Sequence, residues 1–123
     1  MKILVTGSSG FLANFLIKKL KKKHKIIKAD LPKIDISNFN KINNLIVRTK
    51  PDLVIHTAAA KGASKSHLFP KKFFDVNSFG TLNICESMRI NKVKKMVYIS
   101  SCSFYKRKKK EIKEDDLKDF NNP

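Results

Sequence analysis

A glycine-rich turn between an apolar run and a helical pattern constrains the fold more than any other feature of the sequence. Ile3 to Val5 form a short apolar run typical of a buried parallel strand, and the turn Gly7 to Gly10 follows it. Apolar residues then recur at helical spacing from Phe11 to Leu20. The first glycine permits a tight turn, the second lets a diphosphate approach the backbone, and Ala13 is small where the helix packs on the sheet. Strand, turn and helix in this order predict a phosphate-binding loop.

Short apolar runs and helical patterns alternate along the rest of the chain. This alternation predicts an α/β fold with a parallel sheet and helices on both faces. The usual reversal after the third strand gives a Rossmann-type, doubly wound sheet of about four strands in the order 3-2-1-4. We expect further strands at 25–30, 53–55 and 96–99, a helix capped by Ser37 and ended by Pro51, a polar loop at 61–69, and a helix from Pro70 to about Asn91.

An acidic residue stands at the distance from the turn that dinucleotide recognition requires. Asp30 lies 20 residues beyond Gly10, at the end of the second expected strand. A carboxylate there can bind both hydroxyls of a ribose and would repel a 2′-phosphate. The sequence therefore indicates a dinucleotide site that prefers NAD to NADP.

The formal net charge of +17 suggests nucleic acid as a partner, but this interpretation is weaker than that of a dinucleotide-binding protein. Only three of the 27 basic residues are arginine, whereas a groove built for phosphate recognition favours arginine. The basic run from Lys106 to Lys110 is typical of a solvated loop, with nucleotide-sugar phosphates or nucleic acid as alternative contacts. Nucleic acid is therefore not the expected partner.

Cysteine, histidine and hydropathy patterns favour a cytoplasmic protein without a metal. Cys85 and Cys102 form no C-x-x-C pair and are expected as reduced core residues. The three histidines show no zinc spacing. No signal peptide is visible, and no apolar stretch approaches the ~20 residues that cross a bilayer, so no membrane association is expected.

Five blocks of sequence, in order, resemble the extended short-chain dehydrogenases/reductases, specifically the NAD-dependent epimerase/dehydratase group. The blocks span nearly the whole chain. They are Thr6 to Ala13, similar to T-G-x-x-G-x-x-[GA]; Asp35-Ile36, similar to the Asp-Ile pair beside the adenine; Pro51 to Ala59, similar to P-D-x-V-I-H-x-A-A; Val76 to Asn83, similar to V-N-x-x-G-T-x-N; and Val97 to Tyr105, similar to V-Y-x-S-S-x-x-x-Y.

The resemblance implies roles for individual residues. Ser101 matches the active-site Ser/Thr that hydrogen-bonds the reacting sugar oxygen. Asn77 matches a helix asparagine that braces the site, although an asparagine there can equally well satisfy nearby backbone. His56 is expected as a hydrogen-bonded core histidine rather than a base. The expected cofactor-binding residues are Gly7, Gly10, Phe11, Leu12, Asp30, Asp35, Ile36, Ala58, Ala59 and Asn77.

The sequence departs from the family pattern at the catalytic base, a tyrosine in a Y-x-x-x-K motif on a later helix. Tyr105 and Lys109 spell this motif, but Tyr105 already closes the fourth-strand block, and a lysine run makes the match easy to obtain by chance. Lys106 also replaces a family glycine. Residues 1–123 are therefore expected to be an incomplete, C-terminally truncated cofactor domain.

Two functions remain open from the sequence. The first is the cofactor half of an NAD-dependent epimerase, dehydratase or reductase whose substrate is a nucleotide-diphosphate sugar. The second is a dinucleotide-binding module or partner subunit without catalysis. The apolar fourth strand would expose an unpaired edge in the isolated chain, so homo-oligomers or aggregates are expected.

Overall fold

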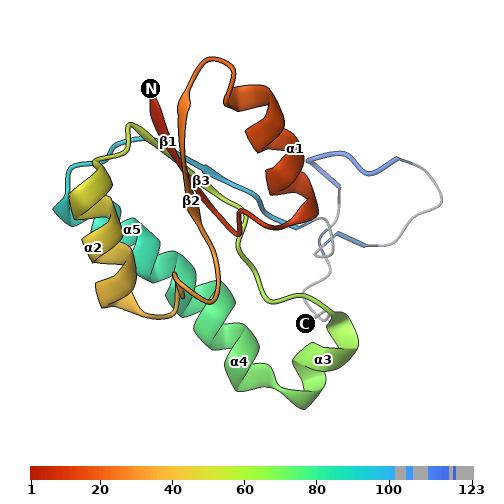
Figure 1. Cartoon of the computed structure of the whole chain (residues 1–123). Helices are drawn as coiled ribbons and strands as arrows, with labels where there is room; N and C mark the ends of the chain where they lie inside the picture. Colours follow the sequence, from red (N-terminus) through yellow and green to blue (C-terminus); the bar gives the residue numbers. More distant parts are fainter. Residues whose placement is uncertain (102–104, 107–110, 117, 119–123) are drawn as a thin grey trace.

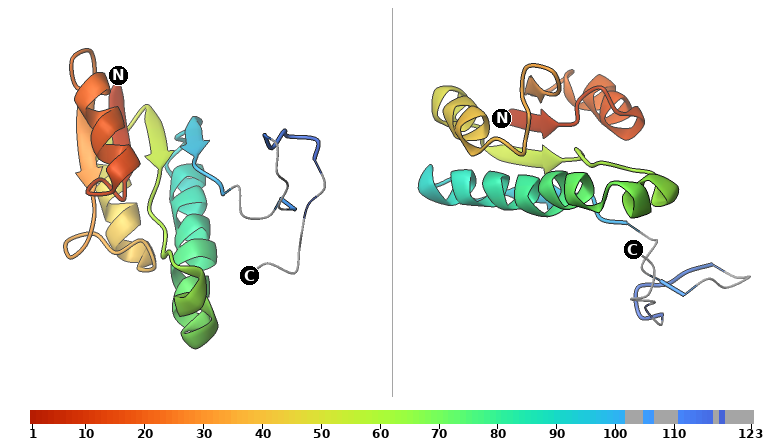
Figure 2. Two further views of the ribbon diagram at one scale, coloured as in Figure 1. Left: turned by 90° about the vertical axis from the view of Figure 1, so that its right-hand side faces the viewer. Right: turned by 90° about the horizontal axis from the view of Figure 1, so that it is seen from below.

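Four parallel strands form one sheet with helices on both of its faces (Figure 1 and Figure 2). The computed structural model describes residues 1–101, 105, 106, 111–116 and 118. The arrangement confirms the Rossmann-type α/β class that the alternating patterns predict. In chain order the elements are β1 (Lys2–Thr6), α1 (Phe11–Leu20), β2 (Lys25–Ala29), α2 (Phe39–Thr49), β3 (Leu53–His56), α3 (Ala63–Leu68), α4 (Pro70–Phe74), the π-helix η1 (Asp75–Phe79), α5 (Gly80–Ile90) and β4 (Met96–Tyr98).

The strand order is β2-β1-β3-β4, so the expected order 3-2-1-4 is wrong. β3 suits an interior position because Val54 and Ile55, which point to opposite faces, are both buried. β2 suits an edge because Lys25 and Lys28 are exposed along it. The chain therefore reverses its direction across the sheet after β2, one strand earlier than expected.

Two apolar clusters fill the space between the sheet and the helices. On one face α1 packs alone, and on the other α2 and α5 pack side by side, as Figure 1 shows. The first cluster contains Ile3, Val5, Ala13, Ile17 and Ile55, and the second contains Leu4, Ala29, Ile36, Ile42, Leu45, Ile46, Val54, Ile84 and Met88.

The ends of two helical segments differ from expectation. Asn38, not Ser37, caps α2, and its side chain accepts a hydrogen bond from the amide of Lys41. Ser37 instead donates both its amide and its hydroxyl to the Asp35 carboxylate, which closes a tight turn before the cap. The expected loop at 61–69 contains the short helix α3, so that expectation is also wrong.

The long helix expected from Pro70 forms, but as three consecutive segments. Pro70 occupies the first turn of α4, and the helical path continues through η1 to the end of α5 at Ile90. The π-helical turn in the middle widens the helix by about one residue per turn, a feature often found at functional sites.

Other expectations have mixed outcomes. Cys85 is exposed, so its expected place in the core is wrong, because it lies on the outward face of α5. Cys102 and most of the basic run after Lys106 lie outside the described residues. No helix in the described part of the chain is long and apolar enough to cross a membrane.

Candidate dinucleotide-binding site

The carboxyl ends of β1 and β3 lie side by side at the point where the chain reverses across the sheet. Ligands of open α/β sheets bind at such a switch point. Gly7 follows β1 with a φ of 65°, and a Cβ there would lie 2.7 Å from the Cα and the amide nitrogen of Ala58. The hydroxyl of Thr57 donates to the carbonyl of Thr6 at 2.6 Å. Glycine is therefore required at position 7, both for its backbone conformation and for the contact with the loop after β3.

A cavity of about 470 Å³ opens between these two loops and the end of β2. Its walls come from the glycine turn, the segment after β2, the segment after β3 and the π-helix. The lining residues are Gly7, Ser9, Gly10, Phe11, Ala29, Asp30, Leu31, Ile34, Asp35, Ile36, Thr57, Ala58, Ala59, Lys61 and Val76.

The start of α1 faces this cavity through the glycine turn. The amide of Gly10 donates to the carbonyl of Gly7, and Asn14 is the first residue to donate back to Gly10, each at 2.9 Å. The amides of a helix's first turn have no partner within the helix and favour an anion. Gly10 has a φ of −64°, which any residue can adopt. A Cβ at this position would lie 3.1 Å from the carbonyl oxygen of Gly7, so the small size of Gly10 serves the turn as well as close approach of a ligand.

The carboxylate of Asp30 is held at the end of β2 by backbone amides. One oxygen accepts from the amide of Ser9 at 2.5 Å, and the other accepts from the amide of Leu31 at 2.9 Å. Partial burial acts to raise the pKa of Asp30, but the hydrogen bonds from Ser9 and Leu31 outweigh it and hold that pKa below its ordinary value. Asp30 therefore carries a negative charge at neutral pH.

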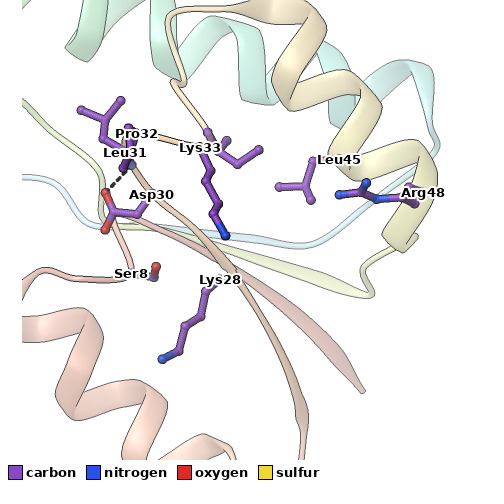
Figure 3. A pocket seen from close by; sticks show the side chains of 9 residues that line it. Ser8, Lys28, Asp30, Leu31, Pro32, Lys33, Leu45 and Arg48 are labelled. Carbon is purple, nitrogen blue, oxygen red and sulfur yellow. Dashed lines mark hydrogen bonds between the residues drawn. The ribbon is translucent and has the colours of Figure 1, made fainter.

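A second pocket, of about 460 Å³, adjoins Asp30 along the outer edge of β2. Figure 3 shows the Asp30 carboxylate at one end of this pocket and Arg48 at the other, with Lys28 and Lys33 between them. The three cations line the same pocket as the anionic carboxylate, and sequence reasoning placed none of them at the site. The sequence signal for two of these cations was the position of Lys28, two residues before Asp30, and of Lys33, three residues after it.

Asn77 projects from the π-helix onto the loop after β3. Its side-chain oxygen accepts from the amide of Ala60 at 2.8 Å, and its side-chain nitrogen donates to the carbonyl of the same residue at 3.1 Å. Asn77 therefore clamps backbone and does not line the cavity. This placement fits both the bracing role and the backbone-satisfying role that the sequence left open.

The structure brings eight of the eleven expected site residues together around the cavity. Leu12 lies outside it on the exposed side of α1, and Ser101 lies beyond the end of β4, also exposed. Lining residues that sequence reasoning missed include Lys61, the one cation on the cavity wall among the described residues. Its position directly after the small-residue segment was the signal for it. The eight expected site residues that line the cavity are Gly7, Gly10, Phe11, Asp30, Asp35, Ile36, Ala58 and Ala59.

Tyr105 lies away from the cavity. Its hydroxyl donates to the carbonyl of Glu114 at 3.4 Å, and the ammonium group of Lys118 lies 5.7 Å from the centre of its ring. Its expected motif partner, Lys109, lies outside the described residues. Among the described residues, no group of three or more acidic, histidine or cysteine side chains could hold a metal ion.

Known proteins share both the sequence and the fold of this chain. A UDP-glucose 4-epimerase from Pisum sativum is 29% identical over 85% of this chain and 37% of its own length. A dTDP-4-dehydrorhamnose reductase from Clostridium acetobutylicum superposes with a TM-score of 0.86 at 29% identity, covering 97% of this chain and 43% of the reductase. A Thermus thermophilus UDP-glucose 4-epimerase in complex with NAD has a TM-score of 0.85 at 23% identity, covering 96% of this chain and 44% of the epimerase, and so shows a shared fold.

The chain spans less than half the length of these relatives. The family match covers residues 3–123, which is nearly every residue of the sequence. It also includes the glycine turn, Asp30 and the loop after β3, which together form the cavity. The chain belongs to the NAD dependent epimerase/dehydratase family.

Proposed function

We propose that this chain is the cofactor-binding portion of an enzyme that epimerises, dehydrates or reduces a nucleotide-diphosphate sugar with NAD. The observation that carries the proposal is the cavity between the glycine turn, Asp30 and the loop after β3. The diphosphate would lie against the start of α1, and the adenine would lie near Asp35 and Ile36. The bound nicotinamide would supply hydride transfer.

Asp30 supports NAD rather than NADP as the cofactor. Its carboxylate is fixed by two backbone amides and is charged, so it can accept hydrogen bonds from ribose hydroxyls. A 2′-phosphate within about 4 Å would be repelled by roughly 1–4 kcal/mol. Lys28 and Lys33 beside it reduce that repulsion, and we propose that they do not overcome it because they line the neighbouring pocket instead.

Calorimetric titration of the chain with NAD and with NADP tests this proposal. We expect NAD to bind about tenfold more tightly, a difference of about 1.4 kcal/mol. Asp30→Asn should reduce the difference in affinity between NAD and NADP. Lys33→Gln, which removes a charge of the opposite sign, should increase that difference. Equal binding of the two cofactors would refute the preference. Gly10→Val should lose both cofactors by blocking the diphosphate. The φ of Gly10 suits any residue, but an added Cβ would lie 3.1 Å from the carbonyl oxygen of Gly7, so a circular dichroism spectrum must show that the variant is folded.

The catalytic half of the proposal concerns Ser101, which we propose hydrogen-bonds the reacting sugar oxygen. Tyr105 is not proposed as the base, since its hydroxyl points to a backbone carbonyl outside the cavity. A cofactor-binding module without catalysis is the competing function. Incubation of the chain with NAD and a panel of nucleotide sugars tests the module: turnover would exclude it, whereas NAD binding without turnover is expected of both functions.

A further inference from the structure

A continuous series of hydrogen bonds runs from the cavity wall through the centre of the sheet to the π-helix. The amide of Ala58 donates to the hydroxyl of Thr6 at 3.5 Å, and this hydroxyl lies 2.7 Å from Nδ1 of His56. Nε2 of His56 lies 3.0 Å from the hydroxyl of Thr81, which donates to the carbonyl of Asn77 at 2.7 Å. Residues from four elements or adjoining loops are thus linked through one imidazole ring.

The directions of these bonds determine which nitrogen of His56 carries the proton. Thr81 donates its single hydroxyl proton to a carbonyl, so it can only accept from Nε2–H. Burial lowers the pKa of His56, so the ring is neutral at pH 7, and with its one proton on Nε2 the unprotonated Nδ1 accepts the hydroxyl proton of Thr6. In this arrangement Thr6, His56 and Thr81 each donate and accept, between the donating amide of Ala58 at one end and the accepting carbonyl of Asn77 at the other.

The same network holds the cavity wall at two points. Ala58 is held through Thr6, and Ala60 is held by the two hydrogen bonds of Asn77. Ala58 and Ala59 line the cavity, so the backbone between the two points is the part of the wall that a ligand would touch. His56 contacts no cavity space itself, and it lies behind the wall.

We infer that neutral His56, protonated at Nε2, is a positioning residue that fixes the wall from Ala58 to Ala60 for the bound dinucleotide. The inference rests on the proposed function for the identity of the ligand, but the network stands without it. The ring is 1% exposed. Hydroxyl groups face it from β1 and α5, and Tyr98 on β4 is the titratable side chain against it, with ring centres 5.4 Å apart.

Protonation would break the series at a definite point. An imidazolium must donate from both nitrogens, so Thr6 would have to accept from Nδ1 as well as from the amide of Ala58. The hydroxyl proton of Thr6 would then lose the acceptor it has in this network. Protonation therefore leaves a buried hydroxyl proton without this acceptor at Thr6, the residue that holds Ala58.

Thr81→Val tests the inference, with Thr49→Val as its matched control. Both threonines donate to the carbonyl four residues earlier in a helix, but only Thr81 also accepts from His56. We expect Thr81→Val to weaken NAD binding about 5-fold, as loss of one hydrogen bond of about 1 kcal/mol implies. Amide hydrogen exchange at Ala58 and Ala60 should accelerate in the same variant. Thr49→Val should change neither, and Thr81→Ser should restore both.

Unchanged NAD affinity and unchanged exchange in Thr81→Val would overturn the inference, as would equal effects of Thr49→Val. Absence of NAD binding by the wild-type chain would refute the proposed function instead, and amide exchange would still decide the positioning role. If Thr81→Val does not fold, nitrogen chemical shifts of His56 in the wild-type chain decide alone. A ring protonated at Nε2 only would support the inference, and a ring protonated at Nδ1 would overturn it.

Discussion

Substitution of Gly7 by alanine should damage the fold and the cavity together. The residue has a φ of 65°, and the added Cβ would lie 2.7 Å from two backbone atoms of Ala58. The loops after β1 and β3 would have to separate, and these loops bound the cavity. A loss of stability and a loss of dinucleotide affinity are therefore expected from one methyl group.

The expected loss of stability in Gly7→Ala has two parts. A left-handed conformation costs an alanine roughly 1–2 kcal/mol. Moving closely packed backbone to relieve the clash adds about 1–3 kcal/mol, the usual cost of overpacking. We therefore expect Gly7→Ala to lower the free energy of unfolding by about 2–5 kcal/mol.

Gly62→Ala isolates the cost of a positive φ, because Gly62 has a φ of 114° and an added Cβ would make only ordinary van der Waals contacts. The nearest atoms to its added Cβ are side-chain carbons of Lys65 at 3.8 Å. Urea unfolding of both variants should show Gly7→Ala to be less stable than Gly62→Ala by about 2 kcal/mol. Equal stabilities of the two variants, with unchanged NAD affinity in Gly7→Ala, would refute the argument from close approach.

Two further predictions concern acid and salt. Burial lowers the pKa of His56 from 6.5 to about 4, so the unfolded chain binds a proton more readily than the folded chain. The free energy of unfolding should therefore fall by about 3 kcal/mol as the pH is lowered from 7 to 4. A constant free energy of unfolding in urea across this pH range would contradict the prediction. β4 pairs with β3 alone among the described strands and leaves Val97, Tyr98 and Ile99 exposed at 47%, 53% and 38%. Association through this open edge should increase with added salt, because salt screens the repulsion of a +17 chain; light scattering that stays monomeric at every salt concentration would oppose it.

Local features were predictable from the sequence because short-range physics determines them. The glycine turn lies between β1 and α1 as expected, since an apolar run, two glycines and a helical pattern in this order are typical of a strand, a turn and a helix. The position of Asp30 at the end of β2 follows from the same spacing. Pro70 begins a helix because its fixed φ and missing amide suit a first turn.

Features that depend on competition between neighbouring residues were harder to predict. Ser37 and Asn38 are both good helix caps, and the choice between them depended on the nearby Asp35 carboxylate, which takes the Ser37 hydroxyl. The helix α3 has a polar sequence without an apolar stripe, so periodicity gave no signal for it. The hydrogen-bond network of His56 joins residues 50 and 25 positions apart, and no spacing rule detects such a contact.

The strand order is the instructive error, because two expectations from the same sequence contradicted each other. In the order 3-2-1-4, β3 would lie two strands from β1, roughly 10 Å away. Ala58 could not then approach the glycine turn, although the family resemblance placed both beside one cofactor. The lysines along β2 and the apolar run from Leu53 to Ile55 in β3 already favoured β2 at the edge and β3 inside. A shared cofactor site requires the loops after β1 and β3 to be neighbours, and only an order with β3 beside β1 satisfies this requirement.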